Sequence, residues 1–165
     1  MREMKPMTLA ELDSAPFRIE LSTTVPGSPE AVFAQLADPT RWVDWFPLMH
    51  RARWTSATTG AVGSERQVDV HVFGGFAERI IAWEPAARFA FTMTASSSPL
   101  VSRMAEDWRI TRDGKGSRLD WTVAAHPTTI GRPATPILRA VLGRMFQRGG
   151  ANLARLLRER GTQVA

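Results

Sequence analysis

The sequence predicts an α+β domain in which a curved antiparallel sheet holds one long C-terminal helix. Three observations lead to this prediction. Residues 17–22 alternate apolar and polar side chains, residues 50–126 carry strand patterns separated by turn signals, and residues 137–160 have the apolar periodicity of a single helix. Because the helical segments are segregated from strands that hairpins connect, we expect an antiparallel sheet, with seven strands in all.

Two short helices are expected between the first strand and the rest of the sheet. Ser28-Pro29 combines a good N-cap with a good first helical residue, and an apolar stripe follows it. Asp38-Pro39 repeats this signal and starts a second helix through Trp42 and Trp45. These two aromatic residues and Phe46 are either core packing or a gate at the mouth of a pocket.

Turn signals set the register of the hairpins. The Gly74-Gly75 pair favours a two-residue turn, which would place Val70 opposite Arg79. A turn at 113–116 would place Trp108 opposite Trp121, and Glu106 opposite Val123. A third turn, at Glu84-Pro85, would pair Trp83 with Phe89 and Ile81 with Phe91, so that Arg79 lies near Met93. The resulting apolar face comprises Val68, Val70, Val72, Arg79, Ile81, Trp83, Phe89, Phe91, Met93, Met104, Glu106, Trp108, Ile110, Leu119, Trp121 and Val123.

Arg79 and Glu106 are the two charged residues on this otherwise apolar face. A lone charge there is costly unless it is paired or solvated. Glu106 therefore has three candidate roles: a buried structural ion pair with Arg79, a polar anchor for a ligand, or a general acid or base whose pKa burial raises. The sequence leaves these three roles open.

The predicted C-terminal helix has an apolar and a basic side. The apolar stripe comprises Leu138, Val141, Leu142, Met145, Phe146, Leu153, Leu156 and Leu157, and the opposite side carries Arg144, Arg148, Arg155 and Arg158. We interpret the arginines as the solvated back of the helix, since no aromatic residues are interleaved with them for stacking on bases. Gly149 lies within the stripe, where it would let the sheet or a ligand approach the helix closely.

Composition excludes several classes of function. The chain has no cysteine, which rules out disulfides, thiolate zinc sites and cysteine nucleophiles. Its formal charge of +5 fits an anionic partner or a coding bias toward arginine. The histidines at 50, 71 and 126 are far apart in sequence, and no metal or cofactor is expected. No apolar run is long enough to span a membrane, and the start lacks the pattern of a signal peptide, so a cytoplasmic location is expected.

The order of these elements resembles the helix-grip superfamily that includes START lipid-binding domains, pollen-allergen-like proteins and polyketide cyclase/dehydrase-like (SRPBCC) proteins. The segments that carry the resemblance are Ser28-Pro29-Glu30-Ala31-Val32-Phe33, Asp38-Pro39 to Trp45, Trp83-Glu84-Pro85, Arg88-Phe89 and Asn152-Leu153 to Leu156. The resemblance covers residues 17–160, which we expect to form a single domain. Residues 1–16 lack clean periodicity and are expected to form an N-terminal arm, and residues 161–165 a tail. It also implies an apolar pocket between the sheet and the C-terminal helix.

The expected function is binding of a hydrophobic or amphipathic small molecule in this pocket. Two alternatives remain: an enzyme like a polyketide cyclase, aromatase or dehydratase with Glu106 as proton carrier, and a protein that grips an apolar segment of a partner. No nucleic-acid partner is expected, and homodimer formation stays open. The candidate ligand-binding residues are Trp42, Trp45, Phe46, Val70, Arg79, Ile81, Phe91, Met93, Glu106, Trp108, Trp121, Val123, Met145, Phe146 and Gly149.

Overall fold

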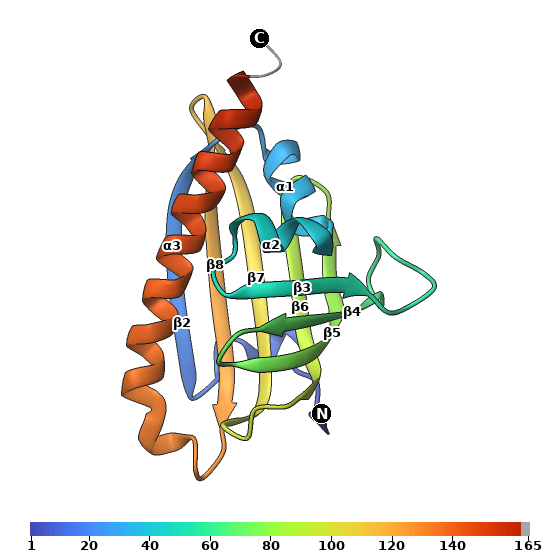
Figure 1. Ribbon diagram of the computed structural model, residues 1–165, viewed down its shortest axis with the longest axis vertical. Coiled ribbons are helices and arrows are strands. Elements are labelled where there is room, and N and C mark those ends of the chain that lie inside the picture. Colours follow the sequence, from blue (N-terminus) through green and yellow to red (C-terminus); the bar gives the residue numbers. More distant parts are fainter. Residues whose placement is uncertain (163–165) are drawn as a thin grey trace.

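The computed structural model, which describes residues 1–162, contains the expected curled antiparallel sheet (Figure 1). Its main strands are β2 (Phe17–Pro26), β3 (Met49–Trp54), β4 (Glu65–Val70), β5 (Gly74–Glu84), β6 (Arg88–Ser96), β7 (Val101–Asp113) and β8 (Gly116–Pro127). They lie in the order β2-β8-β7-β6-β5-β4-β3, and a short additional strand, β1 (Arg2–Glu3), pairs with β6. The predicted fold class and the seven-stranded path are confirmed.

The two short helices after the first strand begin where their capping residues predict. In α1 (Pro29–Ala37) the Ser28 side chain accepts a hydrogen bond from the Ala31 amide. Asp38 accepts from the Thr40 amide and caps a 3-10 turn (Pro39–Arg41) that continues into α2 (Trp42–Trp45). Both caps satisfy amide groups that a helix N-terminus leaves without an intrahelical partner.

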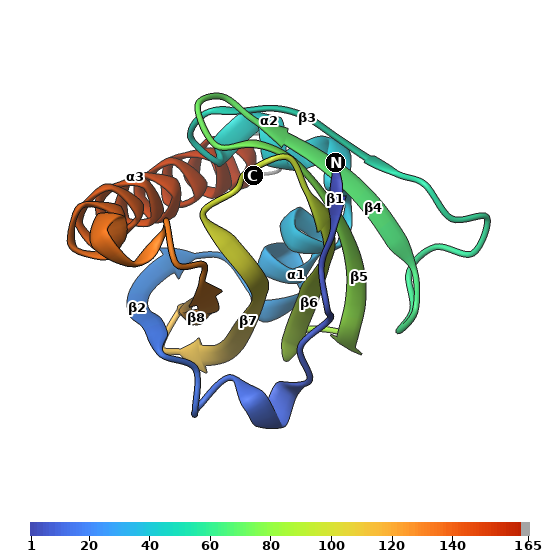
Figure 2. The same ribbon diagram turned by 90° about the horizontal axis from the view of Figure 1, so that it is seen from below.

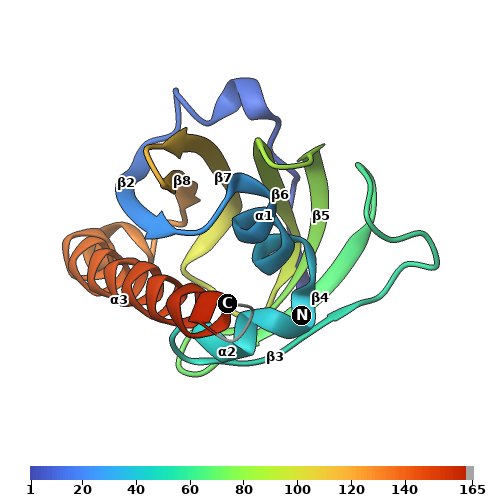
Figure 3. The same ribbon diagram turned by 90° about the horizontal axis from the view of Figure 1, so that it is seen from above.

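The long helix α3 (Thr135–Thr162) closes the gap between the two edge strands of the sheet, β2 and β3 (Figure 2 and Figure 3). It starts two residues before the predicted helix and continues into the predicted tail; residues 163–165 of that tail lie outside the described residues. Adjacent glycines let it approach its neighbours. A Cβ atom at Gly149 would lie 3.3 Å from the Pro47 side chain, and one at Gly150 would lie 3.2 Å from the ring of Trp121.

The N-terminal residues first run alongside β6 as β1, and the segment that follows lies outside the strands on its way to β2 (Figure 2). The Met4 amide donates to the Thr94 carbonyl, and the side chains of Met7 and Leu12 are buried. Met7 and Leu12 form a small second core with Ala105 and other residues of that outer face. The predicted arm is therefore held by apolar burial as well as by β1.

The predicted register is confirmed for β7 and β8 and is wrong for β4 and β5. Trp108 pairs with Trp121 and Glu106 with Val123, as expected. Val70, however, pairs with Gly74 instead of Arg79. The chain turns at residues 71–73, so the two glycines already belong to β5.

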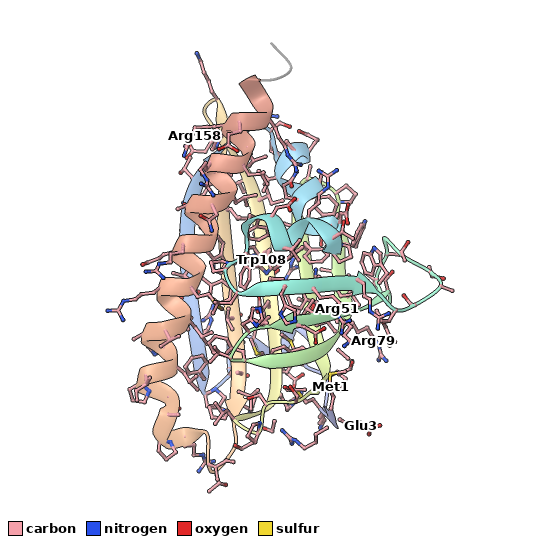
Figure 4. All side chains as sticks on the ribbon, viewed as in Figure 1. Met1, Glu3, Arg51, Arg79, Trp108 and Arg158 are labelled. Carbon is pink, nitrogen blue, oxygen red and sulfur yellow. The ribbon has the colours of Figure 1, made fainter. Side chains whose placement is uncertain are left out.

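This change of register exchanges the two faces of β5, because neighbouring side chains in a strand point to opposite faces. Glu78 lies inside, with only 3% of its surface exposed, whereas Arg79 lies outside and pairs with Glu65. Figure 4 shows Arg79 on the outer side of the sheet and Trp108 in the interior. Ile80, and not Ile81 as predicted, pairs with Phe91, and the ladder is irregular between Ile80 and Ala82. Ile81 packs against the second core, on the outer face.

Candidate functional site

The interior of the curled sheet contains an apolar cavity of about 100 Å³. The sheet, α2 and the first half of α3 contribute its walls. The residues that line it are Phe17, Trp42, Phe46, Met49, Val68, Val70, Phe73, Phe76, Glu78, Phe91, Met93, Ser98, Leu100, Val101, Met104, Glu106, Val123, Ala125, Pro127, Leu138, Leu142, Met145 and Phe146. Two carboxyl groups and one hydroxyl thus interrupt an otherwise apolar lining.

Most of the predicted ligand-binding residues line this cavity. Those that do are Trp42, Phe46, Val70, Phe91, Met93, Glu106, Val123, Met145 and Phe146. Trp108 and Trp121 instead stack on each other, with ring centroids 4.7 Å apart, and pack against Phe146 from behind. Trp45 and Gly149 are likewise packed in the layer around the cavity rather than in its wall. Arg79 and Ile81 do not reach it because of the β5 register.

An ion pair between Arg66 and Glu78 is buried beside the cavity. The Arg66 Nε atom donates to the Glu78 Oε2 atom at 2.5 Å, and 1% and 3% of the two side chains are exposed. The guanidinium group lies over the rings of Trp42 and Phe91, 4.5 and 4.4 Å from their centroids. These rings cover Arg66, so Glu78 reaches the cavity and its partner does not.

Arg66 also carries two donor nitrogen atoms that are not used within the described residues. Its Nη1 and Nη2 atoms are buried and have no hydrogen-bond partner. Such groups are costly to bury, and their stabilisation rests on the charge of Glu78 and on the aromatic faces. Burial raises the pKa of Glu78, and the Arg66 guanidinium opposes this rise.

Glu106 occupies the cavity wall on the other side of β6. It pairs with Phe91 of β6, whose neighbour on the same face, Met93, pairs with Glu78 of β5. The Glu106 Oε2 atom accepts a hydrogen bond from the Trp108 Nε1 atom at 3.1 Å. Burial, and next the negative charge of Glu78, raise the pKa of Glu106 to about 8. This carboxyl group therefore holds its proton at neutral pH and can donate or accept a hydrogen bond.

Glu106 was predicted from the sequence, whereas the buried charges of Arg66 and Glu78 were not. Arg66 precedes Val68 by two residues, so the alternation that placed Val68 and Val70 inside also points Arg66 inside. Extending the strand by one more pair would have found it. Glu78 was missed because the assumed glycine turn shifted β5 by one position.

The described residues contain no group of three or more side chains suited to hold a metal ion. Two of the histidines do meet, which their spacing did not suggest: His50 and His71 stack in solvent with ring centroids 4.1 Å apart. In the same part of the chain, no helix is long and apolar enough to cross a membrane.

Comparison with known families identifies the group to which this fold belongs. Residues 16–158 match the family described as polyketide cyclase/dehydrase and lipid transport. The chain belongs to this family. Uncharacterised proteins of Mycobacterium tuberculosis and Mycobacterium bovis are both 33% identical to it over 149 residues, covering 89% of this chain and 88% of theirs.

Solved structures share the fold at low sequence identity. The di-domain ARO/CYC protein StfQ from the steffimycin biosynthetic pathway superposes with a TM-score of 0.74 at 15% identity, over 93% of this chain and 55% of StfQ. Protein CV1439 from Chromobacterium violaceum has a TM-score of 0.65 at 19% identity, over 86% of this chain and 97% of its own. These likenesses establish the helix-grip fold predicted from the sequence.

Proposed function

We propose that the protein binds an apolar or amphipathic small molecule in the cavity between the sheet and α3. The observation that carries this proposal is the composition of the cavity wall, where Glu78 and Glu106 are the only ionisable side chains among the described lining residues. Apolar walls supply the binding energy through burial, and a few polar groups fix the orientation of the ligand. Membership of a family associated with lipid transport supports the same function.

Filling the cavity tests this proposal. Ala125 is buried in the wall, and Ala151 is exposed on α3. Ala125→Phe should reduce binding of a neutral apolar probe such as Nile red, followed by its fluorescence, whereas Ala151→Phe should leave it unchanged. Thermal unfolding of both variants would show that the fold is retained. Probe binding that survives in a folded Ala125→Phe protein would contradict the proposal.

A second candidate function is proton transfer on a ligand by Glu106, in a reaction of the polyketide cyclase, aromatase or dehydratase type. A carboxyl group with a pKa of about 8 is close to the operating pH, which is the condition for efficient general acid–base catalysis. Its position in the cavity wall would bring it against a bound molecule. The ARO/CYC proteins StfQ and BexL share the fold and support this candidate.

Hydrogen–deuterium exchange on a diketone probe separates the two functions. Benzoylacetone carries acidic protons between two carbonyl groups, and NMR in deuterated water follows their exchange. If Glu106 transfers protons, the protein accelerates the exchange and Glu106→Gln abolishes the acceleration without releasing the probe. Glu159→Gln, on the exposed back of α3, is the matched control. If the probe exchanges at the same rate with Glu106→Gln as with the parent protein, Glu106 does not transfer protons and the proposed function is binding alone.

A further inference from the structure

The polar groups of the cavity are unbalanced in charge. The lining contains two carboxyl groups, from Glu78 and Glu106, and no lysine, arginine or histidine among the described residues. Arg66, the nearest cation, lies behind the rings of Trp42 and Phe91 and already pairs with Glu78. A molecule in the cavity therefore meets acidic groups and no accessible positive charge.

Both carboxyl groups have an oxygen atom that is available to a ligand. Glu78 uses its Oε2 atom for Arg66, and Glu106 uses its Oε2 atom for Trp108. Across residues 1–162, the second oxygen of each carboxyl group has no hydrogen bond within the protein. The two side chains lie on β5 and β7, on either side of β6, and both face the cavity. The free Glu78 oxygen can accept a hydrogen bond, and the protonated Glu106 carboxyl group can accept or donate one, so the apolar wall offers a ligand two polar groups from the neighbouring strands of β6.

We propose, on the basis of the binding function proposed above, that the ligand presents a hydrogen-bond donor, a hydroxyl or protonated amine, to Glu78 and Glu106, and that molecules with a free carboxylate are rejected. A carboxylate would be desolvated beside Glu78 with no cation to pair with, which is a costly arrangement. A hydroxyl group can donate to Glu78, and can donate to or accept from the protonated Glu106 carboxyl group, without a change of charge. An ammonium group displaces the Glu106 proton and forms an ion pair.

A matched series of two-ring probes tests this selectivity. Naphthalene, 2-naphthol, 2-naphthylmethylamine and 2-naphthoate share a ring system and differ in the polar group. Binding is measured by calorimetry near neutral pH, in two buffers of different ionisation enthalpy. We expect 2-naphthol to bind at least about tenfold more tightly than 2-naphthoate. The amine should bind with release of about one proton, because Glu106 is protonated before it binds.

Two substitutions connect the selectivity to Glu106. Glu106→Gln keeps an acceptor oxygen but cannot ionise, so the amine should lose affinity and proton release while 2-naphthol still binds. Glu106→Leu removes the acceptor, so the advantage of 2-naphthol over naphthalene should fall. Glu159→Gln, exposed on α3, should behave like the parent.

The outcomes distinguish this inference from the function on which it rests. If naphthalene and 2-naphthol bind but 2-naphthoate binds equally well, the cavity binds small molecules and the proposed selectivity is wrong. If the amine binds without proton release, the role of Glu106 is wrong. If no member of the series binds, nor Nile red, the proposed binding function itself is overturned.

Discussion

Arg66 and Glu78 form an ion pair that is almost completely shielded from solvent, with the Arg66 Nε atom 2.5 Å from the Glu78 Oε2 atom. One residue away along both strands, Arg79 and Glu65 form the equivalent pair on the outer face, where nearly half of each side chain is exposed. The same two strands thus offer a buried and an exposed cross-strand ion pair for direct comparison.

Removing one member of the buried pair should be strongly destabilising. Glu78→Leu leaves the Arg66 charge without a partner, and we expect a loss of about 3–5 kcal/mol in the free energy of unfolding, measured with urea. The double change Arg66→Met with Glu78→Leu should recover much of this loss. For the exposed pair, Glu65→Leu should cost at most about 1 kcal/mol. Equal losses for Glu78→Leu and Glu65→Leu would contradict the burial of the inner pair.

The stability of the protein should fall as the pH rises through the range in which Glu106 ionises. Its pKa is raised from 4.5 to about 8, so the folded state holds this proton more tightly than the unfolded chain. The stability that the Glu106 proton adds to the folded state is therefore fully present below about pH 4.5, is lost as the pH rises to about 8, and stays lost above that.

Glu106→Gln should remove this part of the pH dependence, because glutamine stays neutral. The variant should exceed the parent in stability at alkaline pH, and urea unfolding across the pH range measures the difference. Burial also raises the pKa of Glu78, so the stability of both proteins should still depend to some extent on pH. Parallel pH profiles for Glu106→Gln and the parent would show that Glu106 is not buried in neutral form.

Two glycines of α3 should respond differently to alanine. Nothing lies within 4 Å of a Cβ atom at Gly143, so Gly143→Ala should stabilise the protein by about 1 kcal/mol through helix propensity. A Cβ atom at Gly150 would lie 3.1 Å from Thr23 and 3.2 Å from Trp121, and these contacts should offset the gain. Thermal unfolding compares the two. A larger gain from Gly150→Ala would mean that α3 lies farther from the sheet.

The basic back of α3 should be dispensable for binding. Arg144, Arg148, Arg155 and Arg158 are exposed and point away from the cavity. Replacing all four by glutamine should leave the affinity for Nile red within about twofold of the parent. A loss of probe binding at unchanged stability would favour a partner or membrane surface on this face.

The accuracy of the predicted strand register depended on which residues form each turn. The glycine of the 113–116 turn adopts a positive φ at Gly114, and the register inferred from that turn is correct along β7 and β8. In the other hairpin two residues have a positive φ, Val72 at 73° and Gly74 at 91°. A β-branched residue in this conformation is rare, so sequence patterns do not predict it.

The glycines that suggested the wrong turn have a different purpose. Gly74 has a φ of 91°, which favours glycine, and a Cβ atom there would collide with the Ser97 hydroxyl, while one at Gly75 would lie 2.8 Å from Asp69. Gly74 thus serves the backbone conformation as well as close approach, and Gly75 serves close approach within the sheet. Prediction of the candidate site depended on the same two turns. Glu106 follows from the correctly predicted β7–β8 hairpin, whereas the inward position of Glu78 and its pairing with Arg66 require the observed β4–β5 register.

The seam between β2 and β3 has a consequence for the range of ligand sizes. These edge strands are not hydrogen-bonded to each other, and α3 covers the gap between them. Within residues 1–162, no backbone hydrogen bond joins α3 to a strand; the side chain of Arg139 reaches the Arg18 carbonyl, and that of Asn152 reaches Trp45 in α2. A closed barrel must break backbone hydrogen bonds between strands to expand, whereas α3 is held by side-chain contacts, so we expect the enclosed volume to adjust to its occupant.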